Sequence, residues 1–143
     1  MSTLDIIDKS CIAMNKDIRF LTRVCHNKLD SDETYRAQKT LNTAISADPT
    51  AVMKVVGPYL LKYAEPISEH DDKFFLAKDF KEDVEDKKDI DTAMKIITTV
   101  KSVYETCSEE EREKIKETAS DMLSHYCEYK LAVAEVEKKI QHK

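Results

Sequence analysis

The amino-acid sequence predicts an all-α, single-domain bundle of about five helices. The chain has 143 residues, which is the length of one domain and enough to bury a core without a metal ion or disulfide bonds. It contains one glycine and three prolines, too few for the many tight turns of an all-β fold, and 36% of its residues are charged. Apolar residues also recur at alternating intervals of three and four in both terminal segments, as they do on buried helix faces.

The first long helix is predicted over residues 1–28. One apolar stripe runs along it for about seven turns. This stripe contains Leu4, Ile7, Cys11, Met14, Ile18, Leu21 and Cys25. Ile6, Phe20 and Val24 widen the stripe beyond a strict coiled-coil seam, which favours packing inside a bundle over an isolated two-stranded coil.

A second helix is predicted over residues 31–47. Asp30 and Glu33 have the spacing of a capping box at its start. The side chains expected to face inward are Tyr35, Leu41, Ala44 and Ile45. Asp48 should cap the next helix, with Pro49 at the first helical position, where a missing N–H costs nothing.

Residues 48–80 form a kinked, aromatic central segment on which the flanking helices are expected to pack. All three prolines, the glycine and three of the four phenylalanines fall inside it. We expect a kink or a short break at Gly57-Pro58, because proline removes a backbone hydrogen bond and clashes with the preceding turn. The residues predicted to fill the core beyond it are Phe74, Phe75, Leu76 and Phe80. Residues 81–89 are nearly all charged and are expected to form a loop.

Two further helices are predicted over residues 90–107 and 108–141. The former should bury Met94, Ile97, Val100, Tyr104 and Cys107. Ser108 and Glu111 form a capping box at the start of the latter. Its seam contains Ile115, Ala119, Met122, Tyr126, Tyr129, Val133, Val136 and Ile140. At ~1.5 Å per residue this last helix is about 45 Å long, more than a domain of this size needs. Its last turns should therefore overhang, pair with the first helix or meet another subunit.

The charge balance argues against a general nucleic-acid-binding protein. The formal net charge is -5 and the pI is about 5.4, whereas such a protein needs a basic face to displace counterions from phosphates. Positive and negative residues alternate along most of the chain, which favours a solvated surface of mixed charge. Weak nucleic-acid binding through a local basic face stays open as an alternative, and it would depend steeply on salt.

The chain is predicted to be intracellular, in the cytoplasm or nucleus. Asp5 and Asp8 interrupt the apolar core that a signal peptide needs, and no apolar run approaches the ~20 residues that span a bilayer, so no membrane partner is predicted. The cysteines stand singly, without a CxxC motif, at Cys11, Cys25, Cys107 and Cys127. This pattern favours reduced thiols packed as small apolar side chains.

The triplet His70-Asp71-Asp72 is the main candidate for catalysis. Helical metal-dependent phosphohydrolases of the HD type hold a divalent ion with a His-Asp pair, a second histidine and a further aspartate. Residues of those types occur in that order at His26, His70, Asp71 and Asp121. The residues around them do not resemble the usual motif of that family, so an exposed polar turn is the favoured interpretation.

Other catalytic and cofactor sites have less support. Cys25-His26 and the pair His125 and Cys127 have the chemistry of zinc ligands, but adjacent helical residues point about 100° apart and cannot both reach one ion. Cys11 and Cys25 lie on an apolar stripe, where a thiol is inert. One glycine excludes a Gly-rich phosphate loop. We therefore predict no enzymatic activity, no metal ion and no cofactor.

The last helix carries the candidate interaction residues. They share its seam face and are Tyr126, Tyr129, Val133, Val136 and Ile140. Tyr126 and Tyr129 can either face a partner or pack between helices, and interior packing is the favoured interpretation. The predicted ligand of this face is a protein partner or a second copy of the chain.

The central segment resembles a family of viral proteins. The residues that carry the resemblance are Tyr59 to Tyr63, Pro66-Ile67, His70 to Leu76 and Asp79-Phe80, which fit the pattern YLxKYxxxIxxxDxxFFLxxDF. A charged linker and a last helix that opens with Ser-Glu-Glu-Glu-Arg follow. The pattern is similar to short helical proteins of nucleocytoplasmic large DNA viruses of algae and amoebae. It implies a viral protein that works in an infected cell or in the virion, and it implies no active-site residues.

These observations predict a non-enzymatic interaction or scaffolding protein. It would act through helix faces that are left over after the core is complete. The resemblance would make it a virion-associated or host-factor-binding component. The alternatives are the metal-dependent phosphohydrolase and the weak nucleic-acid-binding protein described above.

Overall fold

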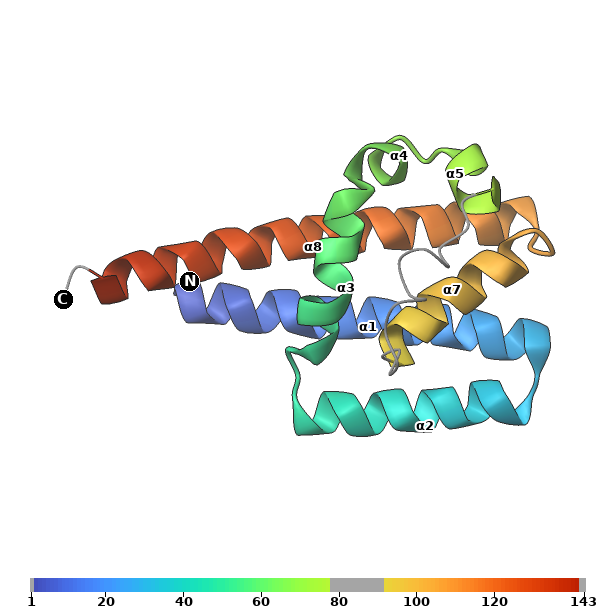
Figure 1. The fold of residues 1–143 in the computed structure, drawn as a ribbon, viewed down its shortest axis with the longest axis horizontal. Coiled ribbons are helices and arrows are strands. Elements are labelled where there is room, and N and C mark those ends of the chain that lie inside the picture. The colour runs from blue at the N-terminus through green and yellow to red at the C-terminus, as the bar shows by residue number, and fades with distance from the viewer. Residues whose placement is uncertain (1, 78–91, 142–143) are drawn as a thin grey trace.

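The computed structural model describes residues 2–77 and 92–141, and within these ranges every regular element is a helix. The helices are α1 (Thr3–Leu29), α2 (Asp32–Ala47), α3 (Ala51–Lys62), α4 (Ala64–Ser68), α5 (Asp72–Ala77), α7 (Thr92–Tyr104) and α8 (Glu109–Gln141). Figure 1 shows α1, α2, α3, α7 and α8 as the main helices and α4 and α5 as short ones. The predicted all-α bundle with long first and last helices is confirmed.

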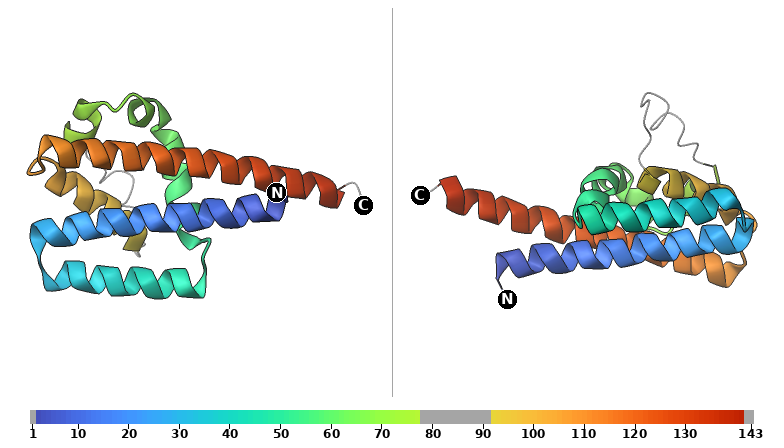
Figure 2. Two further views of the ribbon diagram at one scale, coloured as in Figure 1. Left: turned by 180° about the vertical axis from the view of Figure 1, so that it is seen from behind. Right: turned by 90° about the horizontal axis from the view of Figure 1, so that it is seen from below.

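An antiparallel pair, α1 and α8, forms the long axis of the molecule (Figures 1 and 2). The Lys28 ammonium near the end of α1 lies 2.8 Å from the Glu111 carboxylate near the start of α8. Farther along the pair, Asp17 Oδ2 lies 3.4 Å from His125 Nε2. Helix α2 returns along α1, α7 packs on α1 and α2, and α3 crosses both long helices steeply (Figure 1).

The seam predicted for the first helix is the buried face of α1. Its central residues are all buried, namely Cys11, Met14, Ile18, Leu21 and Cys25. The helix begins with a capping box in which the Asp5 N–H donates to Ser2 Oγ at 3.2 Å and the Ser2 N–H donates to Asp5 Oδ2 at 3.3 Å. Leu4, at the outer end of the seam, is exposed.

Helix α2 is capped by Ser31 and not by the predicted Asp30. Ser31 Oγ accepts from the Thr34 N–H at 3.2 Å, and the Ser31 N–H donates to Thr34 Oγ1 at 3.2 Å. Asp30 instead closes α1 in a left-handed conformation, with φ of 41° and its N–H bonded to the His26 carbonyl. The predicted Asp30–Glu33 box is therefore wrong.

Only a narrow face of α2 is buried. Leu41 and Ile45 lie in the core as predicted, together with Thr34. Tyr35 and Ala44 were predicted to face inward but are exposed. The reason is that α2 is covered on one side only, so residues one position from the buried stripe turn away from it.

Helix α3 begins at Ala51, two residues later than predicted. The Asp48 carboxylate accepts from the Thr50 N–H at 3.0 Å and from the Thr50 hydroxyl at 2.7 Å. These bonds close a turn around Pro49 ahead of the helix. Pro49 is therefore not the first helical residue.

Of the kink or short break expected at Gly57-Pro58, the break is absent, because α3 continues through Pro58 to Lys62. Pro58 is exposed, so its ring meets solvent while the buried face of the helix continues past it. The interruption falls at Tyr63 instead. Pro66 has no N–H to donate to the Lys62 carbonyl, and α3 ends at Lys62.

The chain's glycine lies where α3 crosses α8. The Tyr126 ring packs directly on the Gly57 backbone, and a Cβ atom at Gly57 would overlap that ring. A glycine inside a helix costs about 1 kcal/mol relative to alanine. The close approach of the two helices explains why Gly57 stands at this helical position despite that cost.

A string of aromatic rings joins α3, α5 and α7. Ring centroids lie 5.1 Å apart for Tyr59 and Tyr63, 5.2 Å for Tyr63 and Phe74, 5.3 Å for Phe74 and Phe75, and 5.5 Å for Phe75 and Tyr104. Phe74 and Phe75 pack against the core, as predicted. The aromatic side chains of short α5 thus join it to α3 and α7.

Other predictions for this region have mixed outcomes. Leu76 is exposed rather than buried, because it lies on the opposite side of α5 from the aromatic pair. Phe80, the loop predicted at residues 81–89 and the side chain of Met94 lie outside the described residues. Cys107 is buried, but it lies in the turn after α7, which ends before it.

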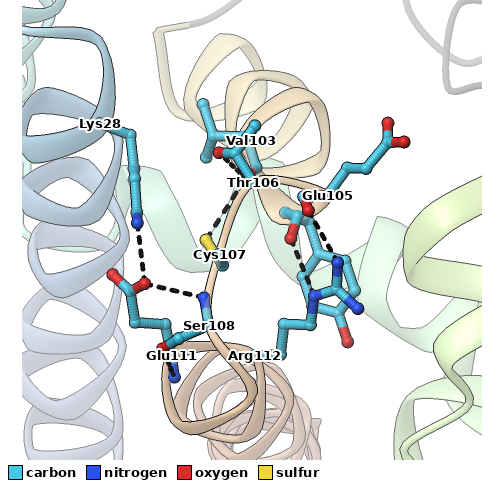
Figure 3. Close-up of polar contacts among 9 residues, drawn as sticks. Lys28, Val103, Glu105, Thr106, Cys107, Ser108, Glu111 and Arg112 are labelled. Carbon is cyan, nitrogen blue, oxygen red and sulfur yellow. Dashed lines mark hydrogen bonds and ion pairs between the residues drawn. The ribbon is translucent and has the colours of Figure 1, made fainter.

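The turn between α7 and α8 joins three helices (Figure 3). Ser108 and Glu111 form the predicted capping box, with N···O distances of 2.9 and 3.2 Å. Glu111 also accepts from Lys28 of α1 at 2.8 Å. Arg112 donates to two backbone carbonyls at the end of α7, at 3.1 and 2.8 Å. The box is confirmed, and it also fixes α8 against α1 and α7.

Asp72 anchors α5 to α7 and α8. Its Oδ1 accepts from the Tyr104 hydroxyl at 2.6 Å and from the Lys116 ammonium at 3.1 Å, and Lys116 lies 2.8 Å from Glu113. Burial and the hydrogen bond to Asp72 raise the pKa of Tyr104 to about 12, and the bond from Tyr104 lowers the pKa of Asp72. The two carboxylates explain how the buried Lys116 keeps its charge.

Gly57→Ala is expected to lower the free energy of unfolding by about 1–3 kcal/mol. Overlap with Tyr126 outweighs the ~1 kcal/mol that alanine gains over glycine in a helix. Urea unfolding followed by circular dichroism measures the difference. In a Tyr126→Ala background the ring is gone, so Gly57→Ala should become stabilising. A stabilising effect in the otherwise unchanged chain would contradict the packing described.

Glu111→Gln is expected to destabilise the protein at neutral pH but not at low pH. The Lys28 and Ser108 bonds lower the pKa of Glu111 from 4.5 to about 2. The ionised carboxylate therefore stabilises the fold above its ordinary pKa, and this contribution is lost as pH falls toward about 2. The free energy of unfolding of the unchanged protein and of Glu111→Gln should be compared from neutral pH down to about pH 2. Glu109→Gln, in the same exposed turn, is the control and should show a smaller pH-dependent difference.

Candidate interaction surface

The terminal arm consists of the ends of α1 and α8, residues 2–12 and 130–141, and its outer part extends past the other helices (Figures 1 and 2). At the base of the arm, Ser10 and Cys11 are buried. The chain between α2 and α3 meets α1 at Asn15, whose Nδ2 donates to the Pro49 carbonyl at 2.9 Å. Helix α3 crosses α8 at Tyr126. Beyond these points, the outer part of the arm has no third helix of residues 2–77 and 92–141 beside it in either figure.

The arm carries the most exposed large apolar side chains of the described chain. Leu131 is 74% exposed, Ile140 67%, Ile12 66% and Leu4 65%. Single exposed apolar side chains are common on soluble proteins. Their concentration at one end of this molecule is what marks the arm as a candidate interaction surface.

Two of these side chains continue a buried seam. Leu4 belongs to the same apolar stripe of α1 as Met14, and Ile140 belongs to the same apolar stripe of α8 as Met122. Both methionines are fully buried. The Lys28–Glu111 and Asp17–His125 contacts place the start of α1 about level with residues 136–139, and the end of α8 extends past it. Of the three predicted arrangements, α8 therefore pairs with α1 and then overhangs (Figure 1).

A groove separates the two helices at the tip of the arm. It has a volume of about 520 Å³ and is lined by Ser2, Thr3, Leu4, Glu135, Val136, Lys139 and Ile140. Apolar side chains from both helices face it, and one acidic and one basic side chain of α8 border it. The seam therefore opens at its end, where the side chains of the two helices do not fill the space between them.

The structure divides the predicted interaction residues into two groups. Tyr126 is buried against Gly57, and Tyr129 packs against the core, which is the interior packing favoured for them. Val133 and Val136 are half-buried, and Ile140 is exposed. The interaction surface therefore begins beyond the tyrosines.

Ile12 and Leu131 are candidate interaction residues that sequence reasoning missed. Both lie off the seams that the three-and-four spacing defines. An apolar side chain outside an otherwise complete stripe is the signal that could have identified them.

The residues of the candidate phosphohydrolase site lie on separate elements. His26 is near the end of α1, with Nδ1 2.9 Å from Thr34 Oγ1, and Asp121 is exposed in the middle of α8. His70 and Asp71 lie in the turn between α4 and α5. Among the described residues, no group of three or more His, Cys, Asp or Glu side chains is placed to hold a metal ion.

The His70-Asp71-Asp72 triplet has structural contacts in this turn. His70 adopts a left-handed conformation with φ of 53°. Asp71 Oδ1 accepts from the Lys73 N–H at 3.0 Å at the start of α5, and Asp72 is the anchor described above. The triplet therefore lies in a polar turn, as the favoured interpretation has it, but His70 and Asp71 are half-buried and only Asp72 is exposed.

The residues considered for zinc are also apart from one another. Cys25 is buried in the core, whereas Cys127 is exposed on α8. His125 lies beside Asp17, whose pKa is raised by burial, an effect that His125 partly opposes. The Asp17–His125 contact thus joins α1 to α8 at the partly exposed edge of the buried seam.

Neither of two other hollows has the features of a ligand site. An apolar cavity of about 50 Å³ lies under Phe74 and Phe75, too small for the ~300–1,000 Å³ that a small-molecule ligand occupies. A groove of about 700 Å³ lies between α2 and α7, and its lining includes Asp32 and Glu33 as well as Arg36 and Lys95. Its opposing charges select no particular ligand.

Comparisons with protein-family models, curated proteins and solved structures found no match for this chain. The similarity of the central segment to proteins of large DNA viruses therefore stays a prediction. Within the described residues, every helix is too short or too polar to cross a bilayer.

Cys127 is expected to be the one rapidly reacting thiol of the native protein. Burial raises the pKa of Cys25 to about 12 and also raises the pKa values of Cys11 and Cys107, whereas Cys127 is exposed. Reaction with DTNB should show one fast thiol, which Cys127→Ser removes and Cys11→Ser retains. The other thiols should react only on unfolding. A second fast thiol in native Cys127→Ser would be inconsistent with this burial.

Proposed function

We propose that the chain is a non-enzymatic interaction or scaffolding protein that binds a protein partner through the terminal arm. The observation that carries this proposal is the concentration of Leu4, Ile12, Leu131 and Ile140 on the arm. Covering apolar surface contributes about 25 cal/mol per Å². These side chains contribute little to the fold while they face water, and they would contribute to binding when a partner covers them.

The other half of the molecule provides a rigid base for such an arm. Glu111, Lys28 and Arg112 join α1, α7 and α8 at the far end, and Tyr126 packs on α3 next to the arm. Because the arm consists of two preformed helices, a partner would order few residues on binding. This is the geometry expected of a docking element.

Charge favours a protein over a nucleic acid as the partner. On α1 the arm carries Asp5 and Asp8 beside a single lysine, Lys9, and on α8 it carries Glu135 and Glu137 among its lysines. Phosphate binding needs a continuous basic face. Apolar side chains ringed by charges of both signs are typical of reversible protein interfaces. The viral resemblance would place the partner in an infected cell or a virion.

Photocrosslinking in the cells in which the chain acts tests this function. Benzoylphenylalanine at Leu131 or Ile140 should give a discrete adduct, because a partner would cover these positions. The same group at Leu61, an exposed leucine of α3, is the matched control and should not give that adduct.

A second substitution separates specific from chance capture. With the photoreactive group at Leu4, the added Ile140→Glu change should abolish the adduct, because both side chains line the groove at the tip of the arm and the change places a charge there. Equal adducts from Leu131 and Leu61, or an adduct that survives Ile140→Glu, would contradict arm-mediated binding.

A further inference from the structure

We infer that the arm binds the arm of a second copy of this chain, so that the tip of each α8 fills the groove of the other copy. This inference rests on the proposed function and names the partner. The two copies would be related by a two-fold axis near residue 137, with their α8 helices antiparallel.

The seam supplies the apolar part of this interface. In an antiparallel pair centred near residue 137, Val133 of one copy is about level with Ile140 of the other, and Val136 lies near the axis. Ile140 would then lie between α8 and the Leu4 end of α1 of the second copy. Both walls of the groove already present apolar side chains there. In this arrangement the exposed end of the α8 seam of each copy covers the exposed end of the α8 seam of the other copy.

The charges on the groove wall are self-complementary. Glu135 and Lys139 both line the groove, and residue 137 is midway between them. A two-fold axis at that point places Glu135 of each copy opposite Lys139 of the other, so one operation forms two ion pairs. Closed dimers require such a patch to match itself, and this favours a second copy over an unrelated partner.

The size of the overlap predicts a weak, reversible dimer. About nine residues of each α8 overlap, which is a length of ~13 Å along helices ~10 Å wide. A strip of this length and width covers roughly 130 Å² of each α8, and the contact with the start of α1 adds to it, so the area stays well below the ~800 Å² per partner of stable complexes. Dissociation constants of tens to hundreds of micromolar are therefore expected, about −5 to −6 kcal/mol at most.

Amide chemical shifts of the purified full chain, recorded from about 10 μM to 1 mM, test the dimer. Resonances of residues 2–7 and 133–141 should shift with concentration, whereas those of α2 should not. Sedimentation equilibrium over the same range gives the dissociation constant. Ile140→Glu should raise it at least about tenfold, since it places a charge in each groove.

Charge exchange tests the two-fold axis itself. Lys139→Glu should raise the dissociation constant about fivefold or more, because both ion pairs become repulsive. Adding Glu135→Lys to that variant should restore the original value. Lys114→Glu changes net charge equally at the other end of α8 and is the matched control. Circular dichroism confirms that each variant keeps its helices.

The outcomes distinguish failure of the second-copy inference from failure of the proposed function. Spectra that stay unchanged to 1 mM, a dimer that resists Ile140→Glu, or a double exchange that fails to restore binding would overturn the second-copy inference. Arm-specific photoadducts with another protein would in that case still support the proposed function. If no photoadduct with another protein forms and the dimer is present, the second-copy inference is supported and self-association is the binding shown for the arm.

Discussion

The close packing of Tyr126 on Gly57 is the contact on which the arrangement of this molecule depends. It lets α3 cross α8 with the helices near enough for the apolar residues of α3 to reach the seam of α1. Any larger residue at this position would move α3 outward. The aromatic string that α3 begins at Tyr59 would then lose its route through Phe74 and Phe75 to α7. One residue without a side chain thus positions three helices.

The corner between α7 and α8 sets the other constraint. Glu111 caps α8 and bonds Lys28, so one carboxylate joins the start of α8 to α1 in the register in which the buried seams pack. Once that register is fixed, helix length alone decides what happens at the far end. Helix α8 has 33 residues and α1 has 27, so the last turn of α8 has no stretch of α1 beside it. The exposed Ile140 is a consequence of that difference.

Sequence patterns predicted the parts of this fold that repeat along a helix. The seams of α1 and α8 and the Ser108–Glu111 cap each follow a local spacing, so the structure reproduces them. Single-residue backbone choices were not predictable in the same way. Asp30 and Ser31 both have good capping chemistry, and the left-handed conformation of Asp30 decides between them. The role of Gly57 could not be seen either, since it depends on a ring 69 positions away.

The surface of the arm shows the same division between local and long-range causes. Ile140 belongs to the predicted seam, but its exposure follows from the length of a different helix. Leu131 and Ile12 are apolar residues off the seams, and both are exposed because they face away from the buried stripes of their helices. Where a larger bundle would bury such side chains, this chain keeps them at one end, ringed by charges of both signs. Side chains placed so are suited to contacts that form and release, because a permanent interface would need more apolar surface than the arm carries.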